Sequence, residues 1–105
     1  MLEKTLKLGK LLDLYGDMLT DKQKEAMDLY YNCDMSLSEV GEEMNVSRQG
    51  VRDTLTRATS ALMEYEEKIG AFRLLSEIKR DLENAIASED INLDDIKSIA
   101  DKIEV

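Results

Sequence analysis

The sequence has no proline, no histidine and only one cysteine, Cys33. The lack of proline favours long helices, because every residue keeps the backbone N–H that a helix interior needs. Without histidine and with a single thiol, the chain has too few ligands for a zinc-type metal site. One cysteine cannot form an internal disulfide, which fits a reducing cytoplasm. We therefore expect a cytoplasmic protein without a metal or other cofactor.

Catalytic motifs are also lacking. The sequence contains no glycine-rich phosphate loop, no nucleophile elbow and no cysteine with a partner base. Its acidic pairs, such as Glu42-Glu43, are adjacent in sequence and therefore do not face each other on a helix. The leucine-rich first residues are interrupted by charges such as Lys4 and Lys7, so neither a signal peptide nor a membrane span is expected. We therefore do not expect this protein to be an enzyme.

Charge is plentiful but uneven along the chain. The formal net charge is −9, and 35% of the residues are charged. Residues 63–105 hold twelve acidic and six basic residues, whereas residues 36–62 hold four and three. Most affinity for nucleic acid comes from neutralised phosphates, so a chain this acidic binds DNA only if its positive side chains gather on one face.

Apolar residues recur at helical spacing and no alternating strand pattern occurs, so we predict an all-α fold. A chain of 105 residues makes one domain, or one domain with an appendage. Thr20 and Gln23 form a capping box that opens a helix extending to about Asn32. Before it, an apolar stripe predicts a first helix over residues 2–16. The members of this stripe are Leu8, Leu11, Leu12 and Tyr15.

Residues 36–55 have the pattern of two helices joined by a tight turn. Ser36 can cap the first helix with Glu39 completing a capping box, and Ser47 can cap the second. Asn45 lies where the chain reverses and tolerates a left-handed backbone, while Gly41 permits the two helices to approach closely. The residues expected to share a small core are Val40, Met44, Val46, Val51 and Leu55. This pattern is typical of a helix-turn-helix, whose second helix can enter a DNA major groove.

The second helix of the motif is predicted to continue from Arg48 to about Ala87. No N-cap follows Gly70, and a glycine inside a helix costs only about 1 kcal/mol relative to alanine. A break at Gly70 that leaves two helices is the alternative. Beyond Gly70 the apolar residues follow a heptad-like seam. The seam consists of Ala71, Leu75, Ile78, Leu82 and Ala85.

A last short helix, capped by Asn92, is predicted to fold back on this seam as an antiparallel hairpin. The predicted organisation is therefore a domain over residues 1–69, containing the N-terminal helix and the helix-turn-helix. Residues 70–105 form a helical C-terminal extension that packs on this domain or on a second subunit.

The candidate nucleic-acid-binding residues lie on the exposed face of the second motif helix, because Val51 and Leu55 point inward. Arg52 can read guanine and Gln49 adenine, whereas Arg57 suits a phosphate. Asp53 on the same helix repels phosphates but can accept a hydrogen bond from cytosine. The full candidate set is Ser47, Arg48, Gln49, Arg52, Thr56 and Arg57. An arginine-bearing solvated face without a ligand is the alternative interpretation.

Residues 19–67 resemble region 4 of bacterial sigma factors. The resemblance is carried by Leu19-Thr20 with Gln23 and Tyr30-Tyr31, by residues 36–43, and by residues 46–52. The whole chain is similar to the YlxM-like helix-turn-helix proteins. That similarity is carried by residues 19–24, Tyr30-Tyr31, Ser47-Arg48-Gln49 and Tyr65-Glu66-Glu67-Lys68. It implies an all-α cytoplasmic protein linked to the signal recognition particle targeting pathway, with DNA binding inferred from the fold.

Two functions follow as hypotheses. The first is a regulatory protein that binds DNA, or the targeting particle's RNA, through the second helix of the motif. The second is an acidic helical interaction module, either a homodimer or an adaptor for a targeting GTPase, without sequence-specific DNA binding. A homodimer carries two recognition helices, so the two hypotheses are compatible.

Overall fold

The computed structural model describes residues 5–88 and 93–103, and every regular element within them is a helix. The all-α prediction is therefore confirmed. The elements run in the order α1 (Leu6–Tyr15), η1 (Gly16–Met18), α2 (Asp21–Met27), η2 (Asp28–Asn32), α3 (Leu37–Met44), α4 (Arg48–Ile69), α5 (Ala71–Ala87) and α6 (Leu93–Ala100). The chain divides into two compact units, the first ending at Ile69 and the second beginning at Gly70.

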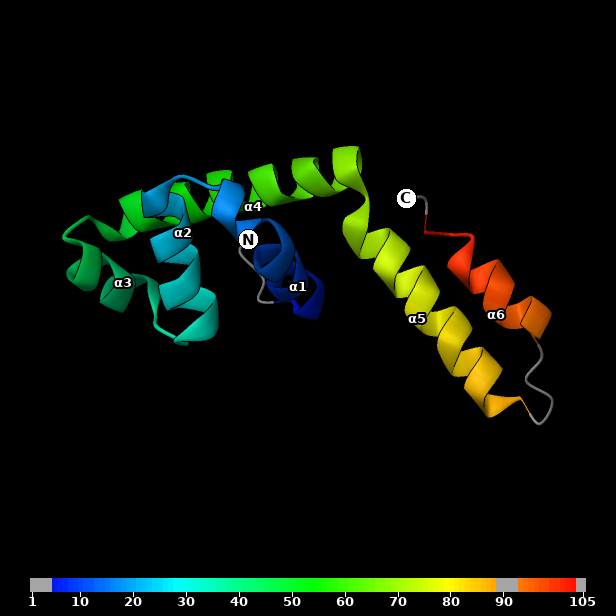
Figure 1. The fold of residues 1–105 in the computed structure, drawn as a ribbon. Helices are drawn as coiled ribbons and strands as arrows, with labels where there is room; N and C mark the ends of the chain where they lie inside the picture. Colours follow the sequence, from blue (N-terminus) through cyan, green and yellow to red (C-terminus); the bar gives the residue numbers. More distant parts are fainter. Residues whose placement is uncertain (1–4, 89–92, 104–105) are drawn as a thin grey trace. The chain divides into compact units, whose positions relative to one another are not determined.

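The first unit is built on α4, which contacts α1, α2 and α3. Figure 1 shows these three helices on one side of α4, with α3 near its first residues. The core of the unit consists of apolar side chains from all four helices and from the segment before α2. Its members are Leu8, Leu11, Leu12, Tyr15, Leu19, Ala26, Met27, Val40, Val51, Leu55, Ala58 and Leu62. The stripe predicted for the first helix is thus buried as expected.

The last turns of α4 are attached to the beginning of the chain by two tyrosines. The Tyr15 hydroxyl donates a 2.8 Å hydrogen bond to Glu66 Oε1, and the Tyr65 hydroxyl donates to the Met18 carbonyl at 3.3 Å. The two rings also contact each other, with centroids 6.3 Å apart. These contacts hold α4 against α1 and η1 and so fix the helix whose first residues form the candidate interface.

The boundaries of the first helices differ from those predicted. The first helix begins at Leu6, where the Thr5 hydroxyl accepts a hydrogen bond from the Leu8 N–H; residues 2–4 lie outside the described part. The second helix is α-helical to Met27 and ends in the π-helical turn η2, which extends to Asn32. Its predicted capping box between Thr20 and Gln23 is present. The π-helical turn was not foreseen from the periodicity.

The prediction of one helix from Arg48 to Ala87 is wrong, and the alternative break at Gly70 is confirmed. Gly70 adopts φ +72°, a left-handed conformation that ends α4 at Ile69. Glycine reaches this conformation without the strain that a Cβ atom causes, so it interrupts the helix at little energetic cost. The Leu74 N–H then donates to the Gly70 carbonyl at 3.0 Å, and Gly70 itself has no side chain with which to cap α5.

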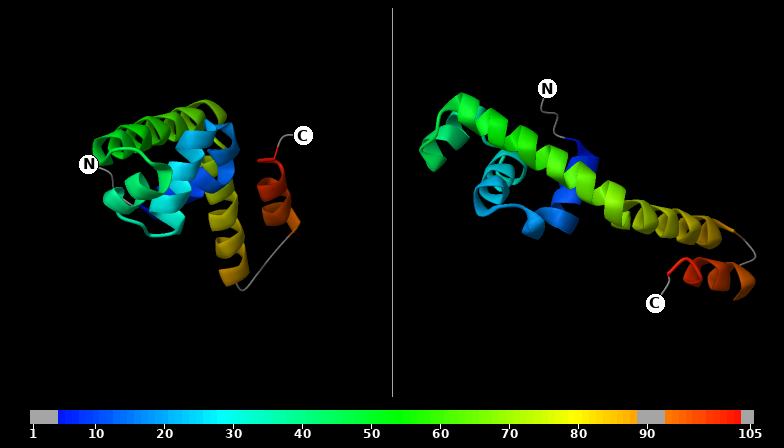
Figure 2. Two further views of the ribbon diagram at one scale, coloured as in Figure 1. Left: turned by 90° about the vertical axis from the view of Figure 1, so that its left-hand side faces the viewer. Right: turned by 90° about the horizontal axis from the view of Figure 1, so that it is seen from above.

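The second unit is the predicted helical hairpin. Helix α6 runs beside α5 in the opposite direction, as both views in Figure 2 show, and Lys102 pairs with Asp81 across the two segments. Among the described residues of this unit, Ile99 alone is buried. The predicted cap Asn92 lies outside the described residues.

Candidate nucleic-acid interface

Helix α3 begins with the predicted capping box. The Ser36 hydroxyl accepts a 3.1 Å hydrogen bond from the Glu39 N–H, and Glu39 Oε1 accepts from the Ser36 N–H at 3.3 Å. These bonds satisfy two backbone donors that the first turn of a helix leaves unpaired. The starting residue of α3 is therefore fixed by its own side chains.

The turn after α3 depends on Asn45 and Gly41. Asn45 has φ 57° and ψ 46°, the left-handed conformation predicted for it. The next residue, Val46, donates its N–H to the Gly41 carbonyl at 2.9 Å. A Cβ atom on Gly41 would lie only 2.7 Å from the Val46 carbonyl oxygen. The closest approach at Gly41 is thus to the backbone of the turn, and the Arg48 nitrogen at the start of α4 lies 3.7 Å from the same position, so the predicted close approach of the two helices is also present.

One member of the predicted small core is exposed and another is only partly buried. Val46 is 42% exposed and Met44 is half-buried, whereas Val40, Val51 and Leu55 are buried. The prediction for Val46 is wrong because the reversal at Asn45 and the hydrogen bond to Gly41 set its direction. Spacing along a helix cannot indicate the direction of a side chain within a turn.

Helix α4 begins as predicted with Ser47 as its cap, whose hydroxyl accepts a hydrogen bond from the Gly50 N–H at 3.0 Å. Val51 and Leu55 are 1% and 0% exposed, so one side of the first two turns of α4 packs into the core of the first unit. All six predicted binding residues are exposed. They are Ser47, Arg48, Gln49, Arg52, Thr56 and Arg57.

The exposed side chains on this part of α4 differ in whether their hydrogen-bond donors are already used within the described part of the chain. Among residues 5–88 and 93–103, no carboxylate forms an ion pair with Arg48, Arg52 or Arg57. Gln49 donates from Nε2 to Asp53 Oδ1 at 3.0 Å, and the Thr56 hydroxyl donates to the Arg52 carbonyl at 2.9 Å. The three guanidinium groups therefore keep their donors for an external acceptor, whereas Gln49 and Thr56 have each used one donor.

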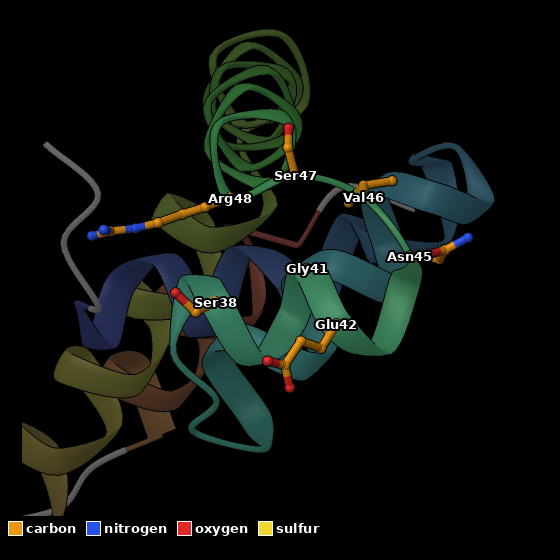
Figure 3. A pocket seen from close by; sticks show the side chains of 7 residues that line it. All are labelled: Ser38, Gly41, Glu42, Asn45, Val46, Ser47 and Arg48. Atoms are coloured by element: carbon orange, nitrogen blue, oxygen red, sulfur yellow. The ribbon is translucent and has the colours of Figure 1, made fainter.

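A shallow hollow of about 550 Å³ lies beside this helix start (Figure 3). Residues Ser38 and Glu42 of α3 line it together with Ser47 and Arg48. Ser38 and Glu42 are four residues apart and so share one side of α3. Ser38 was not among the predicted binding residues, although its spacing from the exposed Glu42 indicates that it shares the exposed side of α3. Glu42 and Arg48 both line the hollow, although Figure 3 shows their charged ends pointing in different directions. The carboxylate of Glu42 lowers the attraction of the hollow for an anion.

The described residues contain neither a metal-binding cluster nor a helix that could span a membrane. No group of three or more histidine, cysteine, aspartate or glutamate side chains there is arranged to hold a metal ion. No helix in this part of the chain has the length and apolar character needed to cross a membrane.

Comparison with known proteins places these features in a family. Residues 2–103 match the model of the UPF0122 family, which is described as "Putative helix-turn-helix protein, YlxM / p13 like". The description names no catalytic activity. A UPF0122 protein of Halalkalibacterium halodurans is 46% identical over 89 residues, covering 82% of each chain. A UPF0122 protein of Bacillus cereus is 40% identical over 107 residues, covering 99% of this chain and 97% of the relative. The chain belongs to the UPF0122 family of YlxM/p13-like helix-turn-helix proteins.

Proposed function

We propose that this protein is a regulatory protein that binds duplex DNA through the first half of α4. The observation that carries the proposal is a set of three exposed arginines without ion pairs among the described residues, in the first half of a helix whose start is fixed by the Ser47 cap and by the turn packed against Gly41. Arg48 and Arg52 share one side of α4, and Arg57 lies about 140° farther round the helix from Arg52. A helix presented in this way fits the major groove of B-form DNA, which is about 12 Å wide. We also propose that the protein is located in the cytoplasm.

Each exposed residue has a role that follows from its chemistry. Arg52 suits bidentate hydrogen bonds to guanine, and Arg48, one turn earlier, suits either a base edge or a phosphate. Gln49 suits a base edge, whereas Arg57 lies farther along α4 and suits a phosphate. The Ser47 hydroxyl accepts from the Gly50 N–H and keeps its proton to donate to a phosphate oxygen, whereas the Thr56 hydroxyl would first have to leave the Arg52 carbonyl.

The charge distribution sets the expected strength of binding. Only Arg57, together with Arg48 if it also meets a phosphate, would release counterions, so the slope of log affinity against log salt concentration should be about −1 to −2. The net charge of −9 opposes non-specific attraction to DNA. Useful affinity therefore has to come from base contacts, which points to a protein that prefers particular sequences.

The test is selection of bound duplexes from a random library, followed by affinity measurement against salt. Arg52→Ala should lose about 5- to 150-fold on the selected sequence, the discrimination of one bidentate base contact. Arg57→Ala should weaken binding to all sequences and reduce the salt slope by about 1. Arg80→Ala, an exposed arginine on α5, is the matched control and should change neither. Equal binding by the unchanged protein and Arg52→Ala would reject the proposal.

The targeting particle's RNA is the alternative nucleic acid. The deep, narrow major groove of A-form RNA does not admit a helix, so α4 should bind an RNA duplex less well than DNA. Resemblance to YlxM-like proteins supports a role in the signal recognition particle pathway, and the same titrations with that RNA test it. Binding of the RNA in preference to every DNA duplex contradicts the DNA-binding proposal.

A second candidate function is homodimerisation through the hairpin of α5 and α6. The hairpin leaves large apolar side chains exposed and has little core of its own. They are Leu74, Leu75, Leu82, Ile86, Leu93, Ile96 and Ile103. Units of fewer than about 40 residues usually need a disulfide, a metal or a partner chain to fold stably. A second copy of the hairpin would supply that partner and would bring two recognition helices together.

Light scattering tests this second candidate. The unchanged protein should be a dimer, and Leu82→Glu should make it a monomer. Leu6→Glu, at an apolar residue of the first unit that is 82% exposed, is the matched control and should leave the dimer intact. A monomeric unchanged protein rejects homodimerisation. If that monomer also retains a targeting GTPase in a pull-down, the hairpin acts as an adaptor instead.

A further inference from the structure

The binding face of α4 contains one carboxylate among its cations. Asp53 is exposed and lies one turn after Gln49, to whose Nε2 its Oδ1 is hydrogen bonded at 3.0 Å. Within the described part of the chain no lysine or arginine forms an ion pair with it, although Arg52 precedes it and Arg57 follows four residues later. The negative charge therefore faces any bound DNA without a neutralising partner.

From this arrangement we propose that Asp53, held by Gln49, selects a cytosine in the bound DNA sequence. This inference rests on the proposed DNA-binding function and adds a base preference to it. Asp53 is assigned as a specificity-determining residue, and Gln49 as the residue that positions its carboxylate.

The hydrogen bond between the two side chains determines what they offer to a base. It uses one of the two N–H groups of the Gln49 amide. The Gln49 Oε1 atom and the second carboxylate oxygen of Asp53 keep their lone pairs, so the pair presents mainly acceptors. In the major groove, acceptors complement the exocyclic amino groups of cytosine and adenine, and are repelled by the oxygen atoms of guanine and thymine.

Between the two amino-bearing bases, the negative charge favours cytosine. Adenine presents the acceptor N7 beside its amino group, and a carboxylate is repelled by that lone pair. Cytosine presents its N4 amino group without an adjacent acceptor in the groove. The guanine paired with that cytosine offers O6 and N7, which suit a neighbouring arginine such as Arg52. A C·G base pair therefore uses the acidic and the basic side chain together.

Asp53 also lowers binding to sequences that lack the cytosine. One unit charge acting on a phosphate at about 8–10 Å across water changes affinity about two-fold. This repulsion applies to every sequence, whereas the hydrogen bond to N4 forms only with cytosine at the correct position. The carboxylate thus increases the difference between specific and non-specific binding.

The decisive variant is Asp53→Asn, which keeps the side-chain shape and can still accept the hydrogen bond from Gln49. It removes the charge and adds an N–H donor, and asparagine pairs with adenine N6 and N7. Glu67→Gln is the matched control, because it makes the same charge change on the same exposed helix. It lies about 21 Å farther along α4, at about 1.5 Å per residue, which is well beyond the Debye length at physiological salt.

The experiment is duplex library selection with the unchanged protein, Asp53→Asn and Glu67→Gln, followed by titration of a random duplex. We expect the unchanged protein to enrich cytosine at one position by about 5-fold or more over other bases. Asp53→Asn should shift that position to adenine and bind the random duplex about two-fold more tightly. Glu67→Gln should match the unchanged protein.

Two outcomes overturn the inference and are distinguishable. If Asp53→Asn enriches the same sequence as the unchanged protein, Asp53 does not select a base, while DNA binding itself stands. If the unchanged protein enriches no duplex, both the base preference and the proposed function fail.

Discussion

Replacing Gly41 with alanine should destabilise the first unit, although alanine is the better helix former. The new Cβ atom would lie 2.7 Å from the Val46 carbonyl oxygen, well inside van der Waals contact. The oxygen belongs to a turn that is held by the hydrogen bond from the Val46 N–H to the Gly41 carbonyl and by the left-handed Asn45. The overlap therefore cannot be relieved by rotating a flexible side chain.

The magnitude follows from two opposing effects. Forcing an extra carbon into a packed site costs roughly 2–3 kcal/mol when the backbone must move. Alanine in place of glycine inside a helix returns about 1 kcal/mol. We expect a net loss of about 1–2 kcal/mol in the free energy of unfolding. For a unit of this size, each kcal/mol lowers the melting temperature by about 4–8 °C.

Gly9→Ala provides the matched control. A Cβ atom on Gly9 meets no atom within 4 Å, so the same chemical change inside α1 has no overlap to relieve. This variant should gain about 1 kcal/mol from helix propensity. The two glycine-to-alanine changes should therefore shift stability in opposite directions.

Urea denaturation followed by tyrosine fluorescence is the assay. All four tyrosines lie in the first unit, so their signal reports on that unit and not on the hairpin. Gly41→Ala should move the midpoint to lower urea, and Gly9→Ala to higher urea. If Gly41→Ala is as stable as the unchanged protein, the turn does not press on Gly41 and the reasoning is refuted.

Three further predictions concern the turn, a helix cap and a surface ion pair. Asn45→Ala should cost about 1–2 kcal/mol because of its left-handed backbone, whereas Asn45→Gly should be nearly neutral; urea midpoints compare them. Ser36→Ala should cost about 1 kcal/mol by removing the cap of α3, and an equal midpoint to the unchanged protein would contradict this. The hydrogen bond and charge of Lys24 lower the pKa of Asp17, and the same contacts raise the pKa of Lys24. The ion pair should therefore contribute to the free energy of unfolding at neutral pH. This contribution should be lost as the pH falls through the lowered pKa of Asp17, or as it rises through the raised pKa of Lys24. The difference in urea midpoint between the unchanged protein and Asp17→Asn should accordingly disappear at low pH.

The caps and the turn could be predicted from the sequence because they depend on residues three or four positions apart. The capping boxes at Thr20 and Ser36, the Ser47 cap and the left-handed Asn45 all form as the residue types require. A hydroxyl three residues before a free backbone N–H meets the same geometry in any helix start. The candidate site was predicted to lie on the exposed side of α4 for a related reason, since Val51 and Leu55 fix the inner side.

The break at Gly70, the exposure of Val46 and the close approach at Gly41 were decided by the tertiary structure. A glycine can continue a helix or end it, and the difference of about 1 kcal/mol is smaller than the packing free energies on either side. Val46 lies in a turn whose direction is set by a hydrogen bond to Gly41, which no periodicity describes. Local propensities therefore determined which helices form and where most of them start. The left-handed backbone at Gly70 decided how far α4 extends, and the hydrogen bond between Val46 and Gly41 decided how the turn before α4 packs.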